Sequence, residues 1–222
     1  EIDHIIDPLP NSSSASSLSE WTMDGRTLNG TNYYPGPIPP DISILTLTSN
    51  NIGVSTGNPL VYDNSLYGVG LRDGIFRLYA TNISQQLDKT ADLTLFRGPV
   101  PAISNNNIYA GNEYGFIYQF NASNLSQILA SQDISNAQHY SSPIAYKNFL
   151  FATDWHSTGG QGIYQLNASN ISQTIAIQSV GSCKSAPAIA NDSLYYPCGS
   201  IVYQLNASNV SVKQSQFTAG GS

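Results

Sequence analysis

The sequence predicts an all-β protein, a small β-propeller of about four four-stranded blades with an extended N-terminal arm. Three observations predict it. A motif returns about every 42 residues along the 222-residue chain. Each copy holds short runs rich in Tyr, Ile, Leu and Val that alternate with polar residues, and Asn, Asp, Gly and Ser turns separate these runs. Four strands in a repeat of this length are typical of a propeller blade.

Three anchors define the repeat and supply the first three strands of each predicted blade. A proline enters an apolar run at Pro59, Pro101, Pro143 and Pro187. A second apolar pair begins after the next turn, at Leu66, Ile108, Leu150 and Leu194. The third anchor is the string Tyr-Gln-Leu-Asn-Ala-Ser-Asn-x-Ser, which is complete from Tyr164 and Tyr203 and recurs in related form from Phe76 and Tyr118. The fourth strands are predicted at residues 92–96, 127–132, 173–179 and 210–217.

The anchors also set the predicted domain bounds. Residues 1–19 form an extended arm with a Ser-rich linker, and residues 20–222 form the propeller, with repeats at approximately 56–96, 97–139, 140–180 and 181–217. Residues 42–48 are predicted as a surplus strand of the fourth type. Either this strand closes the ring against the last blade and frees residues 210–217, or a terminal strand pairs with another molecule, because an unpaired edge invites strand addition.

One copy carries a resemblance to a known family. The strings Ser-Pro-Ile-Ala-Tyr at 142–146, Leu-Phe-Ala-Thr at 150–153 and Ile-Tyr-Gln-Leu-Asn-Ala-Ser at 163–169 resemble the repeat of the PQQ-like (quinoprotein-type) β-propeller superfamily. The resemblance covers about residues 20–217 and implies the propeller fold. Two features differ: the family's Asp-Ala-x-Thr-Gly turn is Asn-Ala-Ser-Asn-x-Ser here, and its blade-docking Trp is missing from the predicted fourth strands. Because no cofactor constellation is evident, we expect a non-enzymatic extracellular member without a cofactor.

The charge and the cysteines limit the function classes. Eight Lys and Arg against 14 Asp and Glu give a net charge of −6, which argues against nucleic acid as a partner. No apolar run approaches the roughly 20 residues of a membrane span. Cys183 and Cys198 bracket a predicted hairpin and come nearly opposite each other, which predicts a disulfide; the alternative is two free thiols. A disulfide requires an oxidising compartment, so we expect an extracellular or cell-surface location.

The motif Asn-x-Ser/Thr, the acceptor of N-linked glycans, is unusually frequent. Seven of the ten copies lie in the repeated turn between the third and fourth strands, where Asn and Ser are also simply good turn formers. We expect several of them to carry glycans. The ten acceptors are Asn11, Asn29, Asn82, Asn121, Asn124, Asn167, Asn170, Asn191, Asn206 and Asn209.

Candidate chemistry is sparse. The three histidines form no motif with a Ser or Cys nucleophile, and neither a catalytic nor a metal-binding set is predicted. Asp154, Trp155 and His156 form a candidate binding loop for a sugar or a partner; the alternative is a solvated insertion with Trp155 packed on a blade. The leader is apolar through Ile2, Ile5, Ile6 and Leu9, side chains that are costly to leave in water. It is either a disordered end or an arm that inserts into a neighbouring molecule.

Two functions follow. The first is an extracellular, glycosylated, non-enzymatic structural protein that self-associates into a cell-surface polymer, either filament- or pilus-like or a surface layer, through strand or arm exchange. Such a charge-poor, glycan-rich propeller would suit an archaeal surface. The alternative is a monomeric secreted propeller that binds a glycan or a peptide. A quinone-dependent dehydrogenase ranks well below both.

Overall fold

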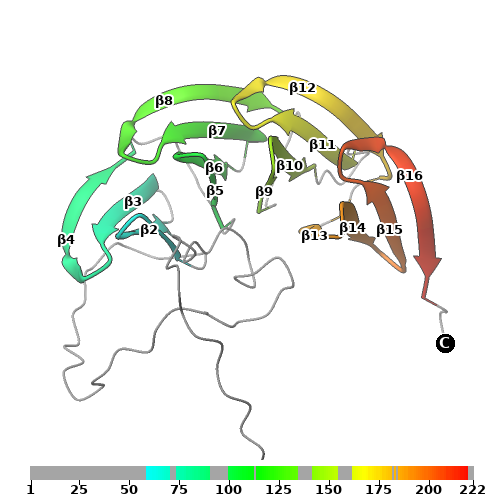
Figure 1. Cartoon of the computed structure of the whole chain (residues 1–222), viewed down its shortest axis with the longest axis horizontal. Helices are drawn as coiled ribbons and strands as arrows, with labels where there is room; N and C mark the ends of the chain where they lie inside the picture. Colours follow the sequence, from blue (N-terminus) through cyan, green and yellow to red (C-terminus); the bar gives the residue numbers. More distant parts are fainter. Residues whose placement is uncertain are drawn as a thin grey trace, which may run out of the picture.

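The computed structural model describes residues 59–70, 74–90, 100–112, 114–134, 142–154, 162–181, 183 and 185–219. These residues form sixteen strands in four antiparallel sheets of four, and the described part of the chain contains no helix. Within it, therefore, no helix is long and apolar enough to cross a membrane. The sheets stand side by side along an arc, with the fourth strand of each on the convex side (Figure 1). This arrangement confirms the predicted four-bladed propeller architecture.

Every blade is a meander in which the strands pair in chain order. The first blade contains β1 (Leu60–Tyr62), β2 (Ser65–Gly70), β3 (Gly74–Tyr79) and β4 (Asn82–Lys89). The second contains β5 (Ala102–Ser104), β6 (Asn107–Gly111), β7 (Phe116–Asn121) and β8 (Asn124–Asp133). The third contains β9 (Ile144–Tyr146), β10 (Phe149–Thr153), β11 (Gly162–Asn167) and β12 (Asn170–Ser179). The fourth contains β13 (Ala188–Ala190), β14 (Ser193–Cys198), β15 (Ile201–Asn206) and β16 (Asn209–Thr218).

The fourth strands begin earlier than the sequence predicts. In the first blade this strand is β4, whereas residues 92–96, where we expected it, lie outside the described residues. The reason is the shortness of the turn: Tyr79 pairs with Asn82, so only two residues separate the third strand from the fourth. Residues 210–217 lie within β16 and pair with β15, so the alternative in which they are freed is wrong. Residues 42–48 lie outside the described residues.

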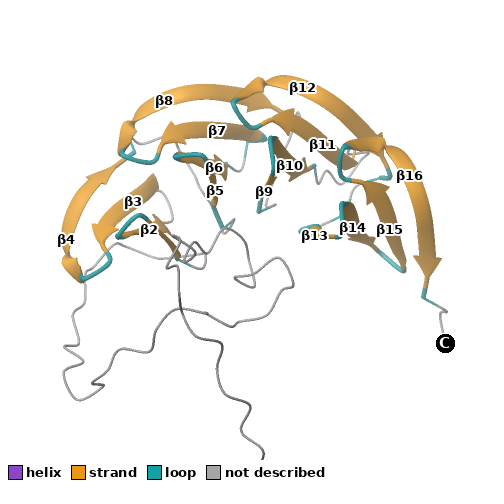
Figure 2. Cartoon of the chain, viewed as in Figure 1, coloured by secondary structure: helices purple, strands orange, loops and turns teal. Residues whose placement is uncertain are grey.

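The first and second strands of each blade are joined by a two-residue hairpin turn, which is coloured teal in Figure 2. Asp63 and Asn64 have φ of 44° and 56°, and Asn105 and Asn106 have φ of 49° and 59°. Two successive left-handed residues define the type I′ turn, which matches the twist of the strands, and Asn and Asp adopt this conformation at low cost. Asn and Asp pairs therefore fix the first hairpin in the first, second and fourth blades, whereas the turn of the third blade has Lys147 in the left-handed region.

The apolar core lies between adjacent blades. One cluster joins Leu60, Tyr67 and Ile75 of the first blade to Ile108 and Phe120 of the second, and all five side chains are buried. A second cluster fills the junction of the second and third blades, and a third cluster that of the third and fourth. Each sheet thus hides its apolar faces on its neighbours, as stacked repeats do.

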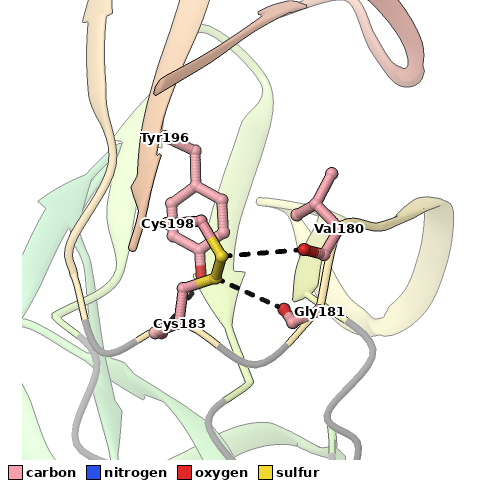
Figure 3. The surroundings of a disulfide bond; sticks show 5 residues. All are labelled: Val180, Gly181, Cys183, Tyr196 and Cys198. Carbon is pink, nitrogen blue, oxygen red and sulfur yellow. Dashed lines mark hydrogen bonds between the residues drawn. A yellow bond between two sulfur atoms is a disulfide. The ribbon is translucent and has the colours of Figure 1, made fainter. Parts of the chain in front are cut away.

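A disulfide joins Cys183 and Cys198, as predicted, with 5.0 Å between the two Cα atoms. It ties the segment that enters the fourth blade to the end of β14 (Figure 3). The buried Tyr196 hydroxyl donates a hydrogen bond of 2.9 Å to the carbonyl oxygen of Cys183. The two sulfur atoms each lie 3.6 Å from a carbonyl oxygen, those of Gly181 and Val180. The bridge is therefore packed against the chain that links the third and fourth blades.

Candidate functional site

The blades are joined by a repeated polar contact that begins at Gln119 in β7. The Gln119 side-chain Nε2 donates to the carbonyl oxygens of Ala168 and Ser169, at 3.4 and 3.3 Å. Its Oε1 accepts the backbone N–H of Ile171 at 3.3 Å. Gln119 is only 2% exposed, so one buried amide satisfies two acceptors and one donor in the turn of the next blade.

Gln165 in β11 makes the same contact with the fourth blade. Its Nε2 donates to the carbonyl oxygens of Ala207 and Ser208, at 3.3 and 3.2 Å, and its Oε1 accepts the N–H of Val210 at 3.0 Å. We call the side chains of Gln119 and Gln165 the junction amides. A buried amide in a low-dielectric junction fixes the register of neighbouring blades, because any slip leaves polar groups without partners.

An ion pair replaces the junction amide between the first and second blades. Arg77 occupies the position of Gln119, and its Nη1 donates to the carbonyl oxygen of Ala122 at 3.2 Å. Asp88 Oδ2 accepts the N–H of Leu125 at 3.3 Å. The two side chains are bound to each other, with Arg77 Nη2 2.9 Å from Asp88 Oδ2. Two charged residues together supply the donor and the acceptor that a single glutamine supplies elsewhere.

Buried tyrosines in the second strands reinforce these junctions. The Tyr67 hydroxyl donates to the carbonyl oxygen of Ala122 at 2.9 Å, and the Tyr109 hydroxyl donates to that of Ala168 at 2.5 Å. Burial raises the pKa of Tyr67, and it raises the pKa of Tyr109 to about 12, because the phenolate would have to lie in an apolar environment. Phe151 takes the equivalent place in the third blade and contributes packing alone.

The sequence contains a signal for these junctions that the repeat analysis did not use. Glutamine stands between an aromatic and an apolar residue in three of the four third strands, at Gln119, Gln165 and Gln204. Gln119 and Gln165 face the next blade, which a repeated polar residue flanked by core residues could have indicated.

The Asn-x-Ser turns between the third and fourth strands contain two kinds of asparagine. The second asparagine of each turn uses its side-chain oxygen to hold the start of the fourth strand: Asn124 Oδ1 accepts the N–H of Ser126 at 3.2 Å and its hydroxyl at 2.7 Å. Asn82 and Asn209 make the same two bonds, and Asn170 makes the backbone bond. Asn124, Asn170 and Asn209 are exposed residues.

The first asparagine of the turn is held on both sides of its amide. Asn121 Oδ1 accepts the N–H of Ser123 at 2.9 Å, while its Nδ2 donates to Gln127 Oε1 at 3.2 Å. Asn167 is bound in the same way to Ser169 and Gln173. Asn206 accepts the N–H of Ser208 at 2.8 Å. The nitrogen that a glycan would modify is therefore engaged at Asn121 and Asn167.

The remaining predicted site residues do not gather into one site. Asp154 is only 3% exposed, and its backbone N–H donates to the carbonyl oxygen of Gly162 at 2.8 Å, so it is not the surface residue that a binding loop needs. Asn191 lies in a first-to-second-strand turn with φ of 50°. The predicted residues outside the described part are Asn11, Asn29, Trp155, His156 and the arm residues Ile2, Ile5, Ile6 and Leu9. Among the described residues, no group of three His, Cys, Asp or Glu could hold a metal ion.

Comparison with known proteins supports the fold alone. No family model matches the sequence, and no curated protein matches it with significance. A europium-containing methanol dehydrogenase superposes with a TM-score of 0.69 at 11% identity, over 90% of this chain and 49% of the other. The quinohemoprotein alcohol dehydrogenase from Comamonas testosteroni gives 0.69 at 9% identity, over 92% and 42%. BamB from Moraxella catarrhalis gives 0.59 at 13% identity, over 75% and 49%.

These similarities have two consequences. The chain spans less than half the length of the three structures it resembles. At 9–13% identity the likeness carries no catalytic residues with it, although two of the three are dehydrogenases. The chain is therefore similar in fold to a methanol dehydrogenase, a quinohemoprotein alcohol dehydrogenase and BamB.

Proposed function

We propose that this chain is a non-enzymatic, extracellular, glycosylated structural protein, a self-associating subunit of a cell-surface polymer. The observation that carries the proposal is the regular presentation of exposed acceptor asparagines, at Asn124, Asn170 and Asn209 in successive blades. Only 10% of the residues are charged, against a usual value of about 25%, so sugars on these turns would supply the missing hydrophilic surface. The disulfide supports an oxidising, extracellular location.

The polymer contact in this proposal joins the N-terminal arm to an exposed strand edge. β16 is a ten-residue strand at the edge of its sheet, and almost all of its residues are exposed. Phe217 is 67% exposed and Val212 is 47% exposed. A free edge with exposed apolar side chains accepts an extended peptide through backbone hydrogen bonds. The arm of another copy, with Ile2, Ile5, Ile6 and Leu9, has the composition to pair there.

Electron microscopy of the full chain, produced with its glycans, tests the proposal. We expect filaments or sheets from the full chain and none after deletion of residues 1–10. The matched control carries Asp3→Asn and Asp7→Asn, which keep the four apolar side chains, and it should still assemble. A full chain that stays a small discrete species at every concentration contradicts the polymer and favours the binding-module alternative. Assembly that survives the deletion contradicts the arm as the link.

A further inference from the structure

The two ends of the arc carry the two complementary parts of a blade-to-blade junction, the side-chain amide at one end and the turn at the other. At each internal junction a third strand supplies a polar side chain, either a junction amide or Arg77, and the Ala-Ser-Asn turn of the following blade receives it. The fourth blade has the amide, Gln204, and the first blade has the turn, Ala80 to Ile83. The described residues of these two blades lie at opposite ends of the arc, as Figure 1 shows.

The amide end is open in the described structure. Val202 and Gln204 are half-buried, whereas the equivalent Ile163 and Gln165 of the third blade are fully buried. Among the described residues, the Gln204 amide bonds only within its own blade: its Nε2 donates to Ser193 Oγ at 3.1 Å, and its Oε1 accepts the Ser215 hydroxyl at 2.7 Å. Both hydroxyl contacts can be exchanged for carbonyl and N–H partners without moving the strand.

The Tyr195 hydroxyl belongs to the same open end. Tyr195 stands at the position of Tyr67 and Tyr109 but is half-buried, whereas those two side chains are fully buried at their junctions. The fourth blade therefore presents a phenol and an amide, the same pair that holds Ala168 between the second and third blades.

The turn end is open in the complementary way. Ala80 and Ile83 are both half-buried, whereas Ala122 and Leu125, the equivalents in the second blade, are 1% and 0% exposed. The turn itself is already built, because the Ala80 N–H donates to the carbonyl oxygen of Asn64 at 3.0 Å, as the Ala122 N–H does to that of Asn106 at 2.9 Å. Val61 and Leu66 beside it are also half-buried, whereas Ile103 and Ile108 are buried.

We propose that a second copy of this chain covers these ends: Gln204 of each copy binds the Ala80–Ile83 turn of the other, and the two copies close into one ring of eight blades. The inference goes beyond the proposed function and does not depend on it. The contact is the junction that the chain already forms three times, so it needs no new surface. Two arcs of four blades give eight, within the usual range for propellers. The solved structures of similar fold are about twice as long as this chain.

The mass of the chain in solution tests the ring. We expect the smallest species of the full chain at micromolar concentration to have twice the 23.8 kDa of one chain, by sedimentation of protein made without glycans. The chain that lacks residues 1–10, and with them the arm proposed to link the polymer, should show the doubled species alone. Gln204→Glu removes both N–H donors and places a carboxylate opposite two carbonyl oxygens, and Ile83→Asp damages the other end. Each variant should raise the dissociation constant of the two copies by roughly 100-fold, because polar or charged groups would be buried at the contact without partners.

Two further samples separate this contact from any other mode of association. Gln204→Arg with Ser215→Asp recreates the Arg77–Asp88 pair at the open end and should restore the double mass. A mixture of the Gln204→Glu and Ile83→Asp chains contains one intact contact and should associate, although neither variant does so alone. A full chain that remains at 23.8 kDa, or a double mass that both single variants leave unchanged, overturns the proposal. Deleting residues 1–10 should leave the ring intact, so failure of the arm and failure of the ring are distinct results.

Discussion

Arg77 and Asp88 form a 2.9 Å ion pair at the junction of the first and second blades. The other two internal junctions have a glutamine amide opposite a small residue at these positions. Arg77 and Asp88 pair in the strand register, as Gln119 pairs with Ala130 and Gln165 with Ala176. The first junction has therefore exchanged both members of the pair together. The exchange conserves one donor toward Ala122 and one acceptor toward Leu125.

The exchange predicts strong coupling between the two positions. Asp88→Ala alone leaves Arg77 without its carboxylate and the Leu125 N–H without its acceptor, and should lower the free energy of unfolding by about 1–2 kcal/mol. The double variant Arg77→Gln with Asp88→Ala recreates the glutamine junction and should come within about 0.5 kcal/mol of the original. Urea unfolding of the two single variants and the double variant measures the coupling. Simple additivity of the two single effects would contradict the shared role.

Removal of a junction amide should be more costly than removal of the same side chain at the open end. Gln165→Leu leaves two carbonyl oxygens and the Val210 N–H buried without partners, and should lower the free energy of unfolding by about 2–4 kcal/mol. Gln204→Leu is the matched control, because Gln204 bonds two hydroxyls of its own blade in the part of the chain that the structure describes. Measured by urea unfolding in dilute solution, where each chain is a single copy, the control should lose less than about 1 kcal/mol. Equal losses would show that the amide acts within its blade.

The local features of this fold could be predicted from the sequence. The period, the strand composition and the Asn and Asp turns each depend on a few neighbouring residues, and they predicted four four-stranded blades. The disulfide was predictable as well, because Cys183 and Cys198 bracket a hairpin that brings their Cα atoms to 5.0 Å.

The features that depend on a neighbouring blade could not be predicted in the same way. A glutamine between core residues follows the polar step of a strand pattern, yet Gln165 is fully buried because the turn of the next blade supplies its partners. The Arg77–Asp88 pair spans eleven residues and matches no motif. Asp154 was expected in a surface loop, but it is buried at the end of the third blade's second strand.

The disulfide should stabilise the fourth blade. The bridge closes a loop of 15 residues, and its loss should lower the free energy of unfolding by about 2–4 kcal/mol. The double variant Cys183→Ser with Cys198→Ser and reduction of the original chain should give the same loss in urea unfolding. Reduction of the double variant is the control and should change nothing. Hydrogen exchange should rise first in β13 and β14, which the bridge fastens, and uniform exchange over all blades would contradict this local role.

Stability should fall in alkali, and Tyr109 should be one cause. Its pKa is raised from 10.0 in the unfolded chain to about 12 in the fold, so the unfolded chain loses the phenol proton first. The stabilising contribution is complete below pH 10 and is lost as the pH rises through about 12. Tyr109→Phe should flatten the decline in free energy of unfolding over this range, measured soon after transfer to each pH. The exposed Tyr114→Phe is the control, and an unchanged decline in Tyr109→Phe would exclude Tyr109 as a cause.

Glycan occupancy should follow the two kinds of asparagine in the turns, if the sugar is attached after folding. N-linked glycosylation modifies the side-chain nitrogen. Asn124 and Asn170 are exposed residues, whereas at Asn121 and Asn167 the side-chain nitrogen donates to a glutamine. Glycopeptide mass spectrometry of protein from a glycosylating host should therefore find sugar on the second asparagine of each turn.

The glutamine partner offers a direct test of this cause. Gln127→Leu removes the acceptor of the Asn121 nitrogen while it leaves the Asn-Ala-Ser motif intact, so occupancy of Asn121 should rise. Asn206 provides a natural comparison, because Val212 stands where Gln127 and Gln173 stand in the earlier blades. Asn206 should thus be modified more often than Asn121 or Asn167 in the original chain. Equal occupancy of all three, unchanged by Gln127→Leu, would mean that the sugar is added before the turn has folded.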